Sequence, residues 1–172
     1  VLVRRSMKNL RQHDVLPTDV AKTIVDLMGV LGIPYDGYFN EHFEKGYGVT
    51  KRVVERYLSK LSLRLREIEE KLETEKPSGL RRLREIMCWS QRRLAEVMKV
   101  KRSTIDYAER GGYDAEKRKA LLAKALEAVR KELDEAEVRI TRLRKLMRLR
   151  FLRVKDVERI PNEGPYRTKW VY

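Results

Sequence analysis

The residues of this chain best suited to chemistry are cationic and polar side chains gathered between positions 91 and 107. The planar fork of an arginine matches the O6 and N7 acceptors of guanine, and lysine and arginine both attract phosphate. Serine and tyrosine hydroxyls donate and accept hydrogen bonds, and an aspartate accepts one from the amino group of cytosine. This set of residue types indicates non-covalent recognition of a nucleic acid.

The sequence offers little for catalysis or metal binding. Cys88 is the only cysteine, which excludes an internal disulfide, and we expect it to pack in a core. The two histidines, His13 and His42, have no metal-site spacing around them. No glycine-rich phosphate loop occurs, and no nucleophile has a base beside it in the sequence. We therefore expect no enzyme activity, no metal site and no cofactor.

The charge balance favours a polyanionic partner. The 172 residues carry 40 Lys+Arg and 26 Asp+Glu, which gives a formal net charge of +14. Such an excess points to DNA, RNA or an anionic membrane surface. Hydrophobic residues make up 42% of the chain, which is enough to form a packed core. This composition excludes a chain that is only a disordered tail.

Other features of the sequence bear on location and source. No run of about 18 uncharged apolar residues occurs, so we expect no membrane span. The first residues, VLVRRSMKNL, lack a following apolar run, so we expect no signal peptide. The expected location is the cytoplasm, in association with the nucleoid, or a virion if the source is viral. Many charged residues with only two glutamines and three asparagines are typical of a thermophile.

The central stretch 79–112 has the apolar spacing of three short helices joined by tight turns. Ser90 stands where a cap of the second helix is expected. Ser103 or a neighbour is expected to start the third helix. The residues assigned to the inner faces are Leu80, Leu83, Ile86, Leu94, Ala95, Met98, Val100 and Ile105.

The run Gln-x2-Leu-Ala-x4-Val-x3-Thr-Ile-x3-Glu, which begins at Gln91, resembles the helix-turn-helix domain of the Cro/C1-type (XRE) repressor family. The resemblance covers 80–112, about a fifth of the chain. The family usually has glycine at the turn, where a left-handed backbone is common, whereas this chain has Lys99. It also has Ala108 where the family often has isoleucine or leucine, and a long helix in place of the family's fourth and fifth helices.

The resemblance implies that a recognition helix over 101–109 enters the major groove of double-stranded DNA. The residues assigned to base reading are Arg102, Ser103, Asp106 and Tyr107, and those assigned to phosphate contact are Gln91, Arg92, Arg93 and Lys101. Arg102 suits guanine, whereas Asp106 would orient Arg102 or select a cytosine. The alternative for each cation is an ordinary solvated surface charge.

Two long helices with heptad spacing flank this unit, over 51–76 and 114–150. Their seams consist of Val54, Leu58, Leu61, Leu65, Ile68 and Leu72 in the first, and Leu122, Leu126, Val129, Leu133, Ala136, Ile140, Leu143 and Met147 in the second. Acids in 67–75 and bases in 117–124 favour an antiparallel hairpin with the central unit at its tip. Pairing of the seams with a second chain, in a homodimer, stays open.

The two ends of the chain carry weaker patterns. Residues 1–50 are expected to form an N-terminal helical region, with one helix beginning near Thr18 and a short one near 36–45. With 51–61 these would make a second, degenerate helix-turn-helix, unless 51–61 is only the start of a coiled coil. The tail 151–172 alternates like strands, which favours a small β-hairpin or an extended arm.

A second basic stretch lies at the end of the later long helix. Its seven bases, with no acid among them, are Arg139, Arg142, Arg144, Lys145, Arg148, Arg150 and Arg153. A second nucleic-acid contact, a solvated coiled-coil face and a helix lying on an anionic membrane surface are the three alternatives.

Together these patterns predict an all-α protein with a central helix-turn-helix between two long coiled-coil-like helices. The expected function is sequence-specific binding of double-stranded DNA by a homodimeric transcriptional regulator from a thermophilic archaeon, bacterium or virus. One alternative is a DNA-organising or viral packaging protein that resembles a small terminase subunit. The other is an RNA- or ribosome-binding factor, because charge alone does not separate DNA from RNA.

Overall fold

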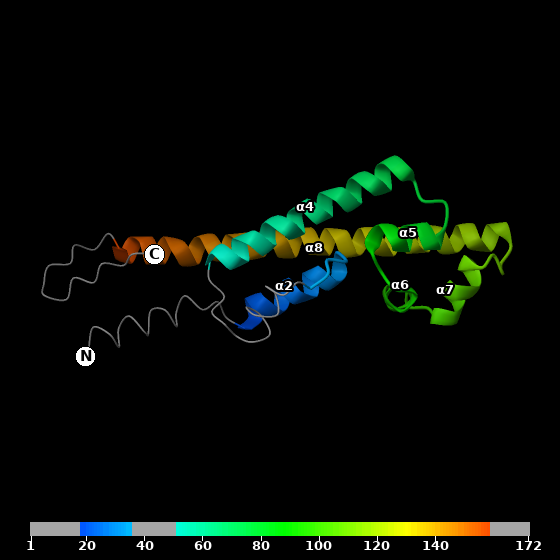
Figure 1. The fold of residues 1–172 in the computed structure, drawn as a ribbon, viewed down its shortest axis with the longest axis horizontal. Coiled ribbons are helices and arrows are strands. Elements are labelled where there is room, and N and C mark those ends of the chain that lie inside the picture. The colour runs from blue at the N-terminus through cyan, green and yellow to red at the C-terminus, as the bar shows by residue number, and fades with distance from the viewer. Residues whose placement is uncertain (1–17, 36–50, 159–172) are drawn as a thin grey trace, which may run out of the picture.

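The computed structural model describes residues 18–35 and 51–158, and these residues form helices without any strand. The helices are α2 (Thr18–Val30), α4 (Lys51–Glu75), α5 (Leu80–Met87), α6 (Gln91–Met98), α7 (Arg102–Glu109) and α8 (Ala115–Glu158) (Figure 1). The predicted all-α class is confirmed. The short helix expected near 36–45, and with it the middle of the degenerate helix-turn-helix, lies outside the described residues.

Helix α8 is the central helix of the molecule, because α2, α4, α5 and α6 all pack directly against it. Helix α4 runs antiparallel to α8 on one side, α2 lies on the other side, and α5–α7 lie beside the N-terminal half of α8 (Figure 1). Along α8 one stripe is buried, made of Ala125, Val129, Leu133, Ala136, Ile140, Leu143 and Met147. The two predicted seams therefore pair within one chain.

Local signals explain where the long helices begin and end. The carboxylate of Asp114 accepts a hydrogen bond of 2.7 Å from the backbone N–H of Lys117, which caps the start of α8. Helix α4 ends at Glu75, just before Pro77. Helix α8 continues to Glu158. The prediction that the tail leaves this helix at residue 151 was therefore wrong. Residues 151–158 contain no glycine or proline to stop the helix. The remainder of the expected hairpin, 159–172, lies outside the described residues.

The register between α4 and α8 differs from the predicted one. Arg144 Nη2 donates to Ser62 Oγ at 2.6 Å, and Glu69 lies close to Glu137. Acids on α4 thus meet acids on α8, and not the bases of 117–124. The reason is that α5 and α6 occupy the N-terminal half of α8, which moves α4 roughly three helical turns toward the C-terminal half.

Within the described ranges, no helix combines the length and the apolar character needed to cross a bilayer.

Candidate nucleic-acid interface

Helices α5, α6 and α7 enclose a small core made of the residues that the sequence assigned to it. Every predicted inner-face residue is buried, except Val100, which is half-buried. Ser90 Oγ accepts from the backbone N–H of Arg93 at 3.1 Å, which confirms the predicted cap of α6. Lys99 has φ 55° and ψ 46°, so a lysine occupies the left-handed turn where glycine is favoured. Helix α7 begins at Arg102, after Lys101, without a side-chain cap.

A hydrogen-bonded network fixes α7 against α5 and α6. Arg84 Nε donates to Glu109 at 2.9 Å, and Gln91 Nε2 donates to the same carboxylate at 2.8 Å. The Glu109 side chain is only 7% exposed. Burial alone would raise the pKa of Glu109, but the hydrogen bonds from Arg84 and Gln91 hold that pKa below its usual range. The network makes the orientation of α7 a rigid property of the unit.

A second set of contacts anchors this unit to α2 and α4. Trp89 Nε1 donates to the carbonyl oxygen of Val30 at 2.8 Å. The guanidinium of Arg64 donates to the carbonyl oxygens of Leu31 and Ile86 at 3.0 and 2.8 Å. These carbonyls belong to the C-terminal ends of α2 and α5, where the helix dipole favours a cation. The Sγ of Cys88 accepts from Arg64 at 3.3 Å, and Cys88 is exposed, so its predicted place in a core was wrong.

Ion pairing leaves three cations of the unit without a partner. The stretch 80–110, all of which the structure describes, contains nine lysines and arginines. Six form ion pairs with acids, namely Arg81, Arg82, Arg84, Arg92, Arg93 and Arg110. The remaining three are Lys99, Lys101 and Arg102. They lie together, in the turn before α7 and at its first residue, where all three side chains are exposed.

The predicted phosphate-contacting residues divide into two groups. Lys101 and Arg92 are exposed, and Arg92 pairs only with Glu96 on its own helix. Gln91 and Arg93 instead point into the protein. Gln91 donates into α7, as described above, and Arg93 lies over the Trp89 ring and pairs with Glu132 of α8 at 3.3 Å. No local signal could reveal that contact, because Glu132 is 39 residues away.

The predicted base-reading residues also differ in their surroundings. Arg102 and Ser103 are exposed. Asp106 is engaged by Gln91 and by Arg110 at 3.4 and 3.1 Å, so it does not orient Arg102.

Tyr107 is 51% exposed and lies against the chain that follows α7. Its ring meets Tyr113 edge-on, with centroids 4.7 Å apart. A Cβ at Gly112 would collide with the Tyr107 ring, so a larger residue there would have to displace that half-exposed ring. Lys117 Nζ lies 4.2 Å from the Tyr113 ring centroid. Tyr113 and Lys117 were not singled out from the sequence.

The second basic stretch is used partly for packing. Arg139 pairs with Asp26 of α2 at 3.4 Å, and Arg144 bonds Ser62 of α4. Arg142, Lys145 and Arg148 are exposed. Arg150 and Arg153 lie on α8, but their side chains are outside the described part of the structure.

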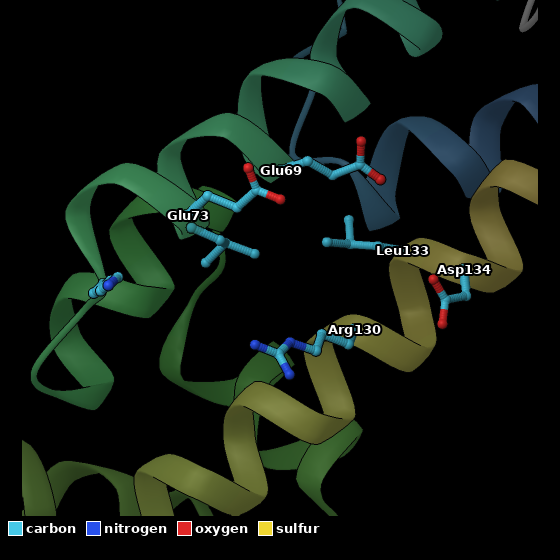
Figure 2. A pocket seen from close by; sticks show the side chains of 7 residues that line it. Glu69, Glu73, Arg130, Leu133 and Asp134 are labelled. Atoms are coloured by element: carbon cyan, nitrogen blue, oxygen red, sulfur yellow. The ribbon is translucent and has the colours of Figure 1, made fainter.

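An acidic cleft separates the end of α4 from α8. It encloses about 820 Å³, with Glu69, Glu73 and Lys76 on the α4 side, Arg130 and Asp134 on the α8 side, and Leu133 pointing between the two helices (Figure 2). Partial burial and the neighbouring Glu137, Glu73 and Asp134 raise the pKa of Glu69. Within residues 18–35 and 51–158, no group of three histidine, cysteine or acidic side chains is arranged to hold a metal ion.

Comparison with known proteins adds no relative from which a role could be transferred. The chain matches no protein-family model, no curated protein and no solved structure.

Proposed function

We propose that the protein binds double-stranded DNA through α7 and the turn before it. The observation that carries this proposal is the position of Lys99, Lys101 and Arg102, the three cations of the unit that no acid neutralises. An unpaired cation can exchange its counterions for phosphates without first breaking an ion pair. The resemblance to Cro/C1-type domains supports the same surface.

In this proposal the exposed start of α7 enters the major groove. Arg102 would donate to the O6 and N7 of a guanine, and Ser103 would contact the neighbouring base. Lys99, Lys101 and Arg92 would contact phosphates on either side. Gln91 and Arg93 would act as positioning residues, because Gln91 Nε2 bonds Glu109 and Arg93 Nη2 pairs with Glu132.

The protein would then act as a homodimeric regulator of transcription that reads two half-sites. An alternative is DNA organisation or packaging with little sequence preference, supported by the exposed Arg142, Lys145 and Arg148 far along α8. RNA is the second alternative, since phosphate contacts do not separate the two nucleic acids.

Selection of bound sequences from a random duplex pool at moderate salt tests the proposal. A regulator should enrich one motif and prefer it over random DNA by about 10³ or more. Arg102→Ala should relax the preference at one base pair by about 1–3 kcal/mol. A flat pool with intact binding would support the packaging alternative, and displacement by RNA competitor would support the RNA alternative.

A further inference from the structure

The exposed side of α8 is divided by charge along the length of the helix. Acids come first along the helix, with Asp134, Glu135 and Glu137, and bases follow, with Arg142, Lys145 and Arg148. All six are exposed. Val138 lies between the two groups and is 50% exposed, and Leu146 among the bases is 54% exposed. The face therefore carries two zones of opposite charge around an uncovered apolar side chain.

Within the described residues, neither zone is neutralised by another side chain. These six side chains form no ion pair or hydrogen bond there, whereas the nearby Arg139 and Arg144 are bound to Asp26 and Ser62. The acids also crowd one another across the cleft, where partial burial and the neighbouring Glu137, Glu73 and Asp134 raise the pKa of Glu69. Both zones would gain from a partner of the opposite charge.

We propose that a second copy of the chain packs antiparallel on this face, with the two-fold axis near Val138. Asp134 and Arg142 lie four residues before and after Val138, so an antiparallel pair places Asp134 of each copy against Arg142 of the partner subunit. The contact is then made twice, as two-fold symmetry requires. A parallel pair would instead place acids on acids and bases on bases.

The same symmetry brings Lys131 near Lys145 of the partner subunit. Glu127 and Glu135 stand four residues before and after Lys131 on its own helix, which offsets this repulsion. A polyanion fits the face less well than a second copy. Phosphates on Arg142 would lie about 8–12 Å along the helix from three carboxylates, whereas a second copy places an acid of each helix beside Arg142 of the other.

This inference deepens the proposed homodimer and rests on it, but its test requires no DNA. Sedimentation of the full-length protein from about 1 to 100 μM should give a mass approaching twice the 20.4 kDa of the chain as concentration rises. Arg142→Glu should raise the dissociation constant at least tenfold, because it places an acid against Asp134 of the partner subunit. Adding Asp134→Lys to that variant should restore the dimer.

A matched control is Lys71→Glu, which reverses one exposed charge on α4 instead of α8 and should leave the mass unchanged. Circular dichroism establishes that each variant keeps its helices. A monomer at every concentration, or a dimer that ignores the Arg142 reversal, would overturn the inference. Failure of the proposed DNA binding would appear separately, as loss of duplex binding by a protein whose mass behaves as expected.

Discussion

The helix-turn-helix unit and the cleft between α4 and α8 are built from similar residues but distribute charge in opposite ways. In the unit most cations meet an acid, often on another helix, and the few left over gather at the start of α7. At the cleft acids meet acids, and partial burial together with these neighbouring acids raises the pKa of Glu69. Paired charges orient helices, whereas unpaired charges of one sign mark surfaces that gain from a partner.

The largest expected effect comes from the buried pair of the unit. Arg84→Met should lower the free energy of unfolding by about 3 kcal/mol, because it leaves the buried Glu109 carboxylate without its arginine. Urea denaturation measures this loss. Arg81→Met is the matched control, because Arg81 lies on the same helix in an exposed pair with Glu85, and it should cost less than about 0.5 kcal/mol. Equal losses would mean that Glu109 does not depend on Arg84.

The same pair predicts a dependence on pH. The pKa of Glu109 is lower in the folded protein than its usual 4.5, so its charge stabilises the fold above that pH. This contribution is lost as the pH falls from 4.5 through the lowered pKa. The stability of Arg84→Met should therefore fall less steeply than that of the wild type over this range, as followed by thermal unfolding at a series of acidic pH values. Identical slopes would contradict the assignment to Glu109.

A smaller effect of opposite sign is expected at the turn. Lys99→Gly should raise the free energy of unfolding by about 0.5–1 kcal/mol, since glycine adopts the left-handed conformation at no steric cost. Lys99→Ala removes the same charge but keeps the strain, so it should leave stability nearly unchanged. If both variants are equally stable, the turn is not strained. Lys99→Gly and Lys99→Ala should weaken DNA binding to the same extent, because they remove the same charge.

The smallest expected effects on the free energy of unfolding have opposite signs in the two regions. Glu69→Gln should stabilise the protein by a few tenths of a kcal/mol, because it removes a carboxylate that faces other acids. Glu96→Gln in the unit should destabilise it by a similar amount, because it breaks the pair with Arg92. Both differences should shrink at high salt in differential scanning calorimetry. If Glu69→Gln and Glu96→Gln changed the free energy of unfolding in the same direction, the contrast between the two regions would be contradicted.

Short-range patterns predicted the helices, because apolar spacing and a cap such as Ser90 act within one or two turns. The left-handed turn at Lys99 was instead implied by the resemblance to Cro/C1-type domains. The register of α4 on α8 was beyond these patterns, since it depends on how much of α8 the helix-turn-helix unit covers. Charge complementarity across the seam was a poor guide because exposed pairs contribute only a few tenths of a kcal/mol each.

Within the candidate site, the sequence predicted which side chains are exposed better than it predicted which residues they bind. Arg102, Ser103 and Lys101 are on the surface as expected. Gln91 and Arg93 have partners that lie 18 and 39 residues away in the chain, which sequence spacing does not reveal. Only the ion pairs that the neighbouring cations form in the structure distinguish Lys99 as an unpaired cation.

The central claim is that unpaired cations at the start of α7 bind DNA. It is tested most directly by the affinity of Lys101→Ala with Arg102→Ala for the duplex selected by the wild-type protein. The control, Arg81→Ala with Arg82→Ala, removes the same charge from side chains that are exposed and ion-paired. The first variant should bind about a hundredfold more weakly, and the control less than about threefold more weakly. Equal losses in the two variants would contradict the claim, because only net charge would then matter.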